Sequence, residues 1–194
     1  MRRTQAERSA TTQQALTKAA IDTLVERGWA ATTAVEVCER AGVTRGALMH
    51  HYPSLAALLA AALQTLYDDV AATAPRVRSL RALLDFTWDR LGRREMKAMF
   101  EAWLAAANNR DLAAEIGPVV ASFSKLVDPH ELPDVQFLDT PDAISFYLVA
   151  REAMLGLAMG RATTGGAGVK HEKQVLARLR AEASAFDAQR KAAS

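Results

Sequence analysis

The stretch VCERAGVTRGALMHHYP, from Val37 to Pro53, constrains the fold most, because it joins two short helical patterns at a lone glycine. Thr33 precedes Glu36 by three residues, which is the spacing of a capping box at the start of a helix. That helix should run through residues 37–41. Gly42, which lacks a Cβ, then allows a sharp turn. Two short helices joined by a tight turn form a helix-turn-helix.

The second helix of this motif has the size and the polar residues of a helix that reads DNA. Thr44 can cap its start, and the helix should end near His50 because Pro53 disfavours a helical Tyr52. A helix of this size fits the major groove of B-DNA, which is roughly 12 Å wide. Its first turn carries Arg45, which can donate two hydrogen bonds to O6 and N7 of guanine.

The residues expected to contact DNA combine base readers with phosphate donors. Gly46 lets the backbone approach the groove, and the hydroxyls of Thr33 and Thr44 can donate to phosphates beside helix N-terminal N–H groups. The full set is Thr33, Thr44, Arg45, Gly46, Met49, His50, His51, Tyr52 and Ser54. The basic excess of the chain also lies here: residues 1–53 contain 7 Lys+Arg and 5 Asp+Glu, whereas the remainder contains 17 of each.

The remainder of the sequence predicts an all-α protein of about nine helices. Alanine and leucine dominate, β-branched and aromatic residues are comparatively few, and no segment has the pattern of a strand. Gly28 should end the first helix, Ser54 should cap a long one, and Gly117-Pro118 should kink or break another. Outside the motif, the expected helices span residues 9–27, 54–74, 79–91, 95–107, 111–127, 140–160 and 169–191.

Composition also restricts where such a chain works. A single cysteine, Cys38, excludes an intrachain disulfide framework. The first residues lack the apolar core of a signal peptide, and no run approaches the roughly 18 apolar residues that a membrane span needs. We therefore expect a soluble cytoplasmic protein with no membrane partner.

Residues 12–63 resemble the DNA-binding region of the tetracycline-repressor (TetR) family of bacterial transcription regulators. The resemblance runs, in order and without gaps, through Gly28, Trp29, Thr32-Thr33, the run from Ala41 to Leu48, His51-Tyr52-Pro53-Ser54 and Leu58. It implies a three-helix DNA-binding domain over residues 1–53. The helix from residue 54 links this domain to a helical ligand-binding and dimerisation domain, residues 54–194.

Two positions depart from the family pattern. The family usually has Tyr where Met49 stands and Lys where Leu55 stands, and both usual residues tend to contact DNA phosphates. Each lost cationic contact should flatten the salt dependence of DNA binding. We therefore expect weaker affinity for the DNA backbone, or compensation from other residues. The candidates are Arg2, Arg3, Arg8, Lys18 and His50.

Aromatic and methionine side chains gather in the body of the sequence. Such side chains usually form a core, but together they can also line an apolar pocket for a small molecule, with a few polar groups fixing its orientation. The expected ligand-binding residues are Phe86, Trp88, Asp89, Met99, Phe100, Trp103, Phe123, Phe146, Tyr147 and Met154. Further polar candidates are Asn108, Arg151 and Glu152.

The last two expected helices carry stripes of large and small apolar residues. The resemblance implies that two protomers form a four-helix bundle there, whereas the alternative is that the stripes close the core of a single protomer. The expected dimer residues are Leu155, Ala158, Met159, Ala162, Leu176, Leu179, Ala183 and Phe186.

We therefore expect a transcriptional regulator, a repressor that binds a near-palindromic double-stranded DNA operator as a homodimer and is released by a partly apolar small molecule. The alternatives are an activator and a helix-turn-helix regulator that senses no ligand. No phosphate loop, serine-nucleophile motif or HExxH spacing indicates an enzyme, and nothing indicates a cofactor. The adjacent His50 and His51 do not face one metal ligand site on a helix, and Cys38 reads as a small buried hydrophobe rather than a redox sensor.

Overall fold

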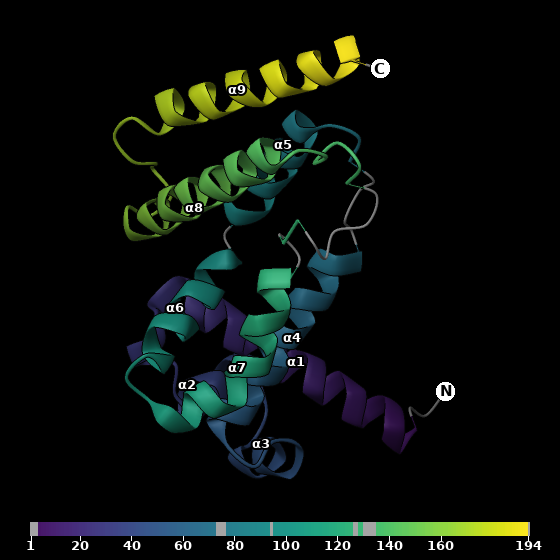
Figure 1. Ribbon diagram of the computed structural model, residues 1–194. Helices are drawn as coiled ribbons and strands as arrows, with labels where there is room; N and C mark the ends of the chain where they lie inside the picture. The colour runs from purple at the N-terminus through teal and green to yellow at the C-terminus, as the bar shows by residue number, and fades with distance from the viewer. Residues whose placement is uncertain (1–3, 73–76, 94, 126–127, 130–134, 194) are drawn as a thin grey trace. The chain divides into compact units, whose positions relative to one another are not determined.

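The computed structural model describes residues 4–72, 77–93, 95–125, 128–129 and 135–193 (Figure 1). Over these residues the regular elements are all helical, which confirms the expected all-α fold of about nine helices. The elements are α1 (Gln5–Arg27), the 3₁₀ helix η1 (Trp29–Ala31), α2 (Ala34–Ala41), α3 (Arg45–His51), α4 (Leu55–Ala72), α5 (Leu80–Leu91), α6 (Met96–Ala106), α7 (Arg110–Lys125), α8 (Pro141–Thr163) and α9 (Glu172–Ala193).

The chain forms two compact units. The first contains residues 1–72 and 97–122, and the second contains residues 73–96 and 123–194. The first unit therefore includes α4 and most of α6 and α7 in addition to the helix-turn-helix. The sequence analysis instead divides the chain by function, into a DNA-binding domain over residues 1–53 and a ligand-binding and dimerisation domain over residues 54–194. That functional division stays a prediction.

The first unit is built on α1, which packs mainly against α2 and α4. Leu16 and Leu24 of α1, Leu48 of α3, and Leu58 and Leu63 of α4 are fully buried. Burying a leucine side chain stabilises a fold by about 1.5–3 kcal/mol, so these five residues are a large part of what holds the helix-turn-helix together.

The first helix begins earlier than residue 9, where the sequence pattern placed it. Thr4 accepts a hydrogen bond from the N–H of Glu7 over 3.2 Å, and the Glu7 carboxylate accepts the Thr4 N–H over 2.7 Å. This is a complete capping box, and it starts α1 at Gln5. The residues that follow it are mostly exposed and polar, so apolar periodicity could not reveal this extension.

Pro118 lies within α7, which runs without interruption from Arg110 to Lys125. The expectation that Gly117-Pro118 could break the helix is therefore wrong, whereas a kink stays a prediction. Pro118 is exposed, so its ring meets solvent on one side of the helix. The Ser122 hydroxyl donates to the Pro118 carbonyl over 3.0 Å.

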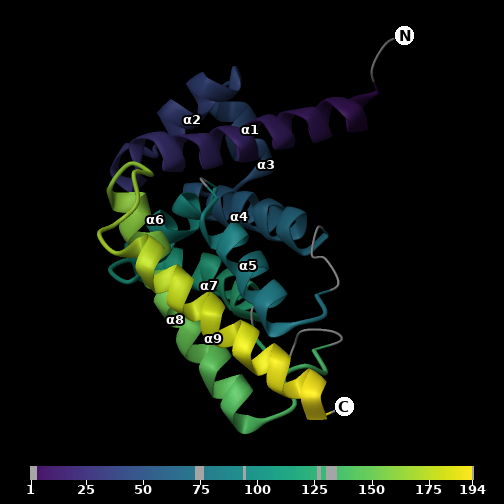
Figure 2. The ribbon, with the colours of Figure 1, turned by 90° about the horizontal axis from the view of Figure 1, so that it is seen from above.

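The second unit is built from α5, α8 and α9. Both α8 and α9 pack on α5, and Figure 2 shows α9 beside α8. Ser79 caps α5 and Thr140 caps α8 through their hydroxyl oxygens, and each is the first residue of a helix range expected from the sequence. Tyr147 and Met154 of α8 are buried in this unit.

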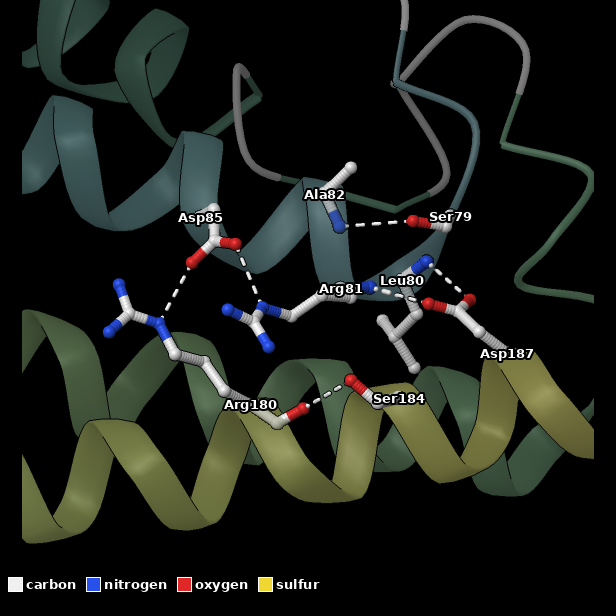
Figure 3. Close-up of polar contacts among 8 residues, drawn as sticks. All are labelled: Ser79, Leu80, Arg81, Ala82, Asp85, Arg180, Ser184 and Asp187. Atoms are coloured by element: carbon white, nitrogen blue, oxygen red, sulfur yellow. Dashed lines mark hydrogen bonds and ion pairs between the residues drawn. The ribbon is translucent and has the colours of Figure 1, made fainter.

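Polar contacts join α9 to the start of α5 (Figure 3). The Asp187 carboxylate accepts the N–H groups of Leu80 and Arg81 over 2.9 and 3.0 Å. Asp85 accepts from Arg81 and from Arg180, both over 2.8 Å. Asp187 thereby satisfies N–H groups that have no partner within the first turn of α5, and it places a negative charge at the positive end of that helix.

Two helices are apolar enough, by length and composition alone, to cross a membrane. These are α4 and α8, each with a mean hydropathy of 1.3 over its window. The expectation that no run approaches this composition is therefore wrong. The alanines between the leucines raise the hydropathy, and the core helix of a soluble protein passes the same test. Leu58 and Leu63 of α4 and Tyr147 and Ala150 of α8 are fully buried in their units.

Candidate nucleic-acid interface

The recognition helix α3 is anchored on one side and exposed on the other. Its cap, Thr44, accepts the Ala47 N–H over 3.2 Å, and Leu48 fixes the helix by being fully buried. Gly42 ends α2 in the left-handed conformation with φ of 67°, which an L-residue with a side chain rarely adopts. The predicted helix–turn–helix is therefore confirmed, and the turn depends on this glycine.

The exposed face of α3 carries four of the nine residues predicted to meet DNA. Arg45, Gly46 and His50 are exposed, and Met49 is 48% exposed. Arg45 forms no ion pair with any residue that the structure describes. A solvated guanidinium in the first turn of a short helix is free to donate to a base edge or a phosphate.

The threonine and serine residues of the predicted set all act as helix caps. Thr33, Thr44 and Ser54 accept backbone N–H groups over 3.2, 3.2 and 3.0 Å. Capping uses an acceptor lone pair of the hydroxyl and leaves its hydrogen to donate, so each can cap a helix and contact a phosphate at once. Glu36 does not complete the capping box at Thr33. Its carboxylate pairs with Arg27 over 2.7 Å.

His51 and Tyr52 form the edge of the exposed face rather than its centre. Both are half-buried. The His50 and His51 rings meet edge to face at 5.2 Å, and the Tyr52 ring lies 6.5 Å from that of His51. Burial raises the pKa of the Tyr52 phenol, so its hydroxyl is neutral near pH 7.

Ion pairs neutralise most of the other cations around the motif. Arg27 pairs with Glu36, Arg40 with Glu26, and Lys18 with Asp22. Of the residues proposed to compensate for Met49 and Leu55, Arg8 is exposed, while Arg2 and Arg3 lie outside the described residues. The positive charge that remains on this face is therefore concentrated near Arg45.

Cys38 is buried in α2, with 6% of its surface exposed. Burial raises the pKa of its thiol, with Arg45 acting in the opposite sense. A neutral, covered thiol reacts slowly with oxidants, which fits a small hydrophobe. Within the described ranges, no three His, Cys, Asp or Glu side chains are grouped so as to hold a metal ion.

The predicted ligand residues divide between the two units. Met99, Phe100 and Trp103 belong to the first unit, where Met99 and Phe100 are buried and Trp103 is 44% exposed. The others belong to the second unit, in which Tyr147 and Met154 are buried and Phe86, Trp88, Phe123 and Phe146 are half-buried.

Within the second unit, several of the predicted ligand residues already contact other side chains. The Arg90 guanidinium lies 5.0 Å from the Phe86 ring centre, and that of Arg161 lies 5.2 Å from Trp88. Phe146 packs against Phe186 at 5.3 Å. Asp89 is exposed and pairs with Arg93 over 3.0 Å. Burial raises the pKa of the Tyr147 phenol, while Thr87 and Arg151 act in the opposite sense.

The predicted dimer residues divide between core and surface. Ala158, Leu176 and Ala183 are buried within the protomer, so they contribute to its own core. Leu155, Met159, Ala162, Leu179 and Phe186 are half-buried. The exposed residues of α8 include Val149, at 67%, and Gly156, which the sequence stripes did not include.

Sequence reasoning missed Lys97 and Glu101 of α6. Lys97 Nζ donates to the Val25 carbonyl over 2.7 Å, and Glu101 Oε2 accepts the Trp29 N–H over 2.9 Å. Both partners lie 72 residues away along the chain. Because the two residues are four apart on one helix, their local pattern favours an ion pair with each other instead.

The fold and this exposed, capped helix define a DNA-binding protein of the helix-turn-helix class. Residues 16–62 match the model of the bacterial regulatory proteins of the tetR family. An HTH-type transcriptional regulator of Mycobacterium bovis is 30% identical over 132 residues, which are 64% of this chain and 68% of that protein. The chain therefore belongs to the TetR family of transcriptional regulators.

Two further comparisons are a sequence match to part of the chain and a structural match to most of it. The transcriptional regulator CymR of Pseudomonas putida is 45% identical over 69 residues, which are 36% of this chain but only 34% of CymR. A TetR-family regulator from Rhodococcus sp. covers 91% of this chain and 97% of its own, with a TM-score of 0.65 and 21% identity. The first match spans about a third of each chain, and the second shows a fold shared over 91% of this chain.

Proposed function

We propose that this regulator is a repressor that binds a near-palindromic operator as a homodimer in the cytoplasm and is released by a small molecule. The observation that carries the DNA-binding part is the exposed first turn of α3, where Arg45 is solvated beside Gly46 while Leu48 anchors the helix. A two-fold dimer would present two such helices to successive major grooves, roughly 34–36 Å apart.

The proposed DNA interface divides into two kinds of contact. Arg45, Met49 and His50 face the base edges, and Gly46 allows close approach. Thr33, Thr44, His51, Tyr52 and Ser54 surround them and donate to phosphates. Because the Leu55 side chain carries no charge, we expect this interface to neutralise fewer phosphates than its relatives with lysine at that position.

The proposed dimer surface combines exposed faces of α8 and α9. TetR-family regulators act as dimers. On α8, Ser145, Val149, Glu152 and Gly156 are exposed and share one face, and on α9 a row of alanines is exposed. Small side chains let helices of two copies approach closely, and Val149 supplies an apolar contact at the centre. The half-buried Leu155 and Met159 would flank this face.

The proposed ligand binds in the body of the protein. TetR-family regulators bind small molecules. Within the second unit, aromatic and methionine side chains of α5 and α8 supply an apolar lining, with Asp89, Arg151 and Glu152 as candidate polar groups. A ligand releases the operator only if it binds the DNA-free arrangement of the dimer more tightly than the DNA-bound one. The coupling free energy is typically about 1–3 kcal/mol.

The experiment that tests the proposal is selection of the purified protein against a random pool of duplex DNA at a fixed salt concentration. Enrichment of a near-palindrome supports a dimeric, sequence-specific regulator and supplies the operator for a screen of releasing compounds. No enrichment would contradict it. An operator occupied only in the presence of a compound would contradict release by a ligand, and one that no compound releases would favour a ligand-independent regulator.

A further inference from the structure

A bend of the backbone between α1 and α2 precedes the recognition helix in the chain. Two side chains of α6 form hydrogen bonds with backbone groups of this bend, which we call the corner. We define the corner as residues 25–33, which contain the last turn of α1, η1 and the cap of α2. Lys97 Nζ donates to the Val25 carbonyl over 2.7 Å, and Glu101 Oε2 accepts the Trp29 N–H over 2.9 Å. We propose that Lys97 and Glu101 are positioning residues that fix the corner and, through it, the recognition helix.

Each contact matches the charge of the backbone group it meets. The Val25 carbonyl is one of the last four of α1, which have no partner within the helix and form its negative end. The ammonium group of Lys97 satisfies that carbonyl and is favoured there. The Trp29 N–H begins η1 and likewise has no partner within it, and the Glu101 carboxylate accepts it. Hydrogen bonds to charged groups are stronger than neutral ones.

Gly28 leaves the space that the Glu101 carboxylate occupies. A Cβ at this position would lie 3.2 Å from Glu101 Oε2, and the backbone has a φ of 76°. A side chain at position 28 would therefore be strained and would also press on the carboxylate. The glycine that ends α1 is thus also the residue that lets α6 reach the corner.

Short hydrogen bonds connect the corner to the helix-turn-helix. The Thr32 N–H donates to the Trp29 carbonyl, and the Thr32 hydroxyl donates to the Gly28 carbonyl, both over 2.9 Å. Thr33 then caps α2, and the ion pair between Arg27 and Glu36 ties α2 back to α1. Displacement of the Trp29 N–H would therefore move the start of α2, and α3 follows α2 after a single tight turn.

Lys97 and Glu101 are not simply a surface pair. Opposite charges four residues apart on a helix commonly pair with each other, and such exposed pairs contribute little stability. In the part of the chain that the structure describes, both side chains instead contact the corner. The helix α1 packs mainly on α2 and α4. The two polar contacts therefore attach α6 to the end of α1 at defined backbone groups.

The first test reads the Glu101 contact directly in the free full-length protein. Exchange of the Trp29 backbone amide with solvent, followed by NMR, should accelerate about tenfold in Glu101→Leu, because one charged hydrogen bond is lost. Glu101→Gln keeps an acceptor oxygen and should restore most of the protection. Glu115→Gln, an exposed carboxylate of α7 in the same unit, is the matched control. Unchanged exchange in Glu101→Leu would overturn the proposal.

The second test reads the consequence for DNA, and it rests on the proposed function. Glu101→Leu and Lys97→Met should each weaken binding to the selected operator by about fivefold to tenfold. The slope of log affinity against log salt should stay unchanged, because no phosphate contact is removed. Lys97→Arg and Glu101→Gln should rescue affinity, and Arg110→Met on α7 is the control for a lost cation.

The outcomes separate the two hypotheses. Faster Trp29 exchange with unchanged operator affinity would overturn the positioning role, because the corner would then move without consequence for α3. A lower melting temperature that the conservative variants fail to rescue would assign the two residues to stability alone. If the wild-type protein selects no DNA sequence, the proposed function fails, and the exchange of the Trp29 amide still decides whether Glu101 holds the corner.

Discussion

At the residue scale, Arg45 is the side chain from which base reading is expected, because it is solvated in the first turn of α3. Arg45→Ala should reduce discrimination at one base position of each half-site by about 1–3 kcal/mol. Binding to the selected operator and to single-base variants of it, at one salt concentration, measures the effect. Arg110→Ala, which removes an exposed cation of α7, serves as control. If Arg45→Ala leaves base preference intact, Arg45 does not read a base.

His171 is the one residue other than glycine with a positive φ, 67°, in the described part of the chain. It precedes α9, and the left-handed conformation costs an L-residue about 1–2 kcal/mol. His171→Gly should therefore be more stable than His171→Ala by about 1 kcal/mol, since only glycine relieves the strain. Urea unfolding of the two variants measures this difference. Equal stabilities would show that the backbone relaxes at this position without a glycine.

At the element scale, Asp187 links α9 to the start of α5. Asp187→Ala leaves the Leu80 and Arg81 N–H groups without their carboxylate, so it should lower the free energy of unfolding by about 1–3 kcal/mol. Asp187→Asn keeps a single acceptor oxygen, so its free energy of unfolding should lie between those of the wild type and Asp187→Ala. Chemical denaturation measures both, with the exposed Gln189→Ala on the same helix as control. A loss no larger than that of Gln189→Ala would mean that solvent satisfies the start of α5 equally well.

The ion pair between Arg161 and Glu172 joins α8 to α9 and should make stability depend on pH. Glu172 is buried, and its hydrogen bond with Arg161 lowers the pKa of its carboxyl. A lowered pKa in the folded state stabilises the protein above the unfolded value of about 4.3, and this contribution is lost as pH falls through the folded value.

Glu172→Gln should therefore be less stable than wild type at neutral pH, and the gap should narrow as the pH falls toward and below about 4. Urea titrations at a series of pH values measure the difference in free energy of unfolding between the two proteins. The other carboxylates titrate in both proteins, so their contributions cancel in this difference. A gap that stays constant over this range would show that the carboxylate is not stabilised by its partner.

The sequence predicts elements better than it predicts contacts between them. Caps at Thr33, Thr44, Ser54, Ser79 and Thr140 follow from local chemistry, because each hydroxyl meets an N–H three residues on. The roles of Lys97, Glu101 and Asp187 depend on backbone groups far away in the sequence, and no local pattern contains that information. Stripe patterns likewise identify apolar residues without saying which neighbour covers them, as Ala158 and Leu176 show.

At the scale of the whole molecule, the proposed dimer is expected to use the exposed face of α8. Val149 is 67% exposed, and an aspartate there would bring two like charges together across a two-fold axis. Val149→Asp should therefore shift the protein toward monomer and weaken operator binding, as light scattering and a DNA titration would show. Val35→Asp, at a position 57% exposed in the first unit, is the matched control for oligomeric state. A Val149→Asp protein that remains dimeric would place the interface elsewhere.

The buried thiol of Cys38 makes the chain convenient for site-directed spectroscopy. Because it is the single cysteine and its pKa is raised by burial, thiol-reactive dyes and spin labels should leave it largely unmodified in the folded protein. A cysteine introduced at an exposed position outside the proposed interface, such as Glu115 of α7, would then carry the label alone. In a two-fold assembly one substitution supplies a pair of labels, so the separation of the two copies could be followed directly while DNA or a candidate ligand is added.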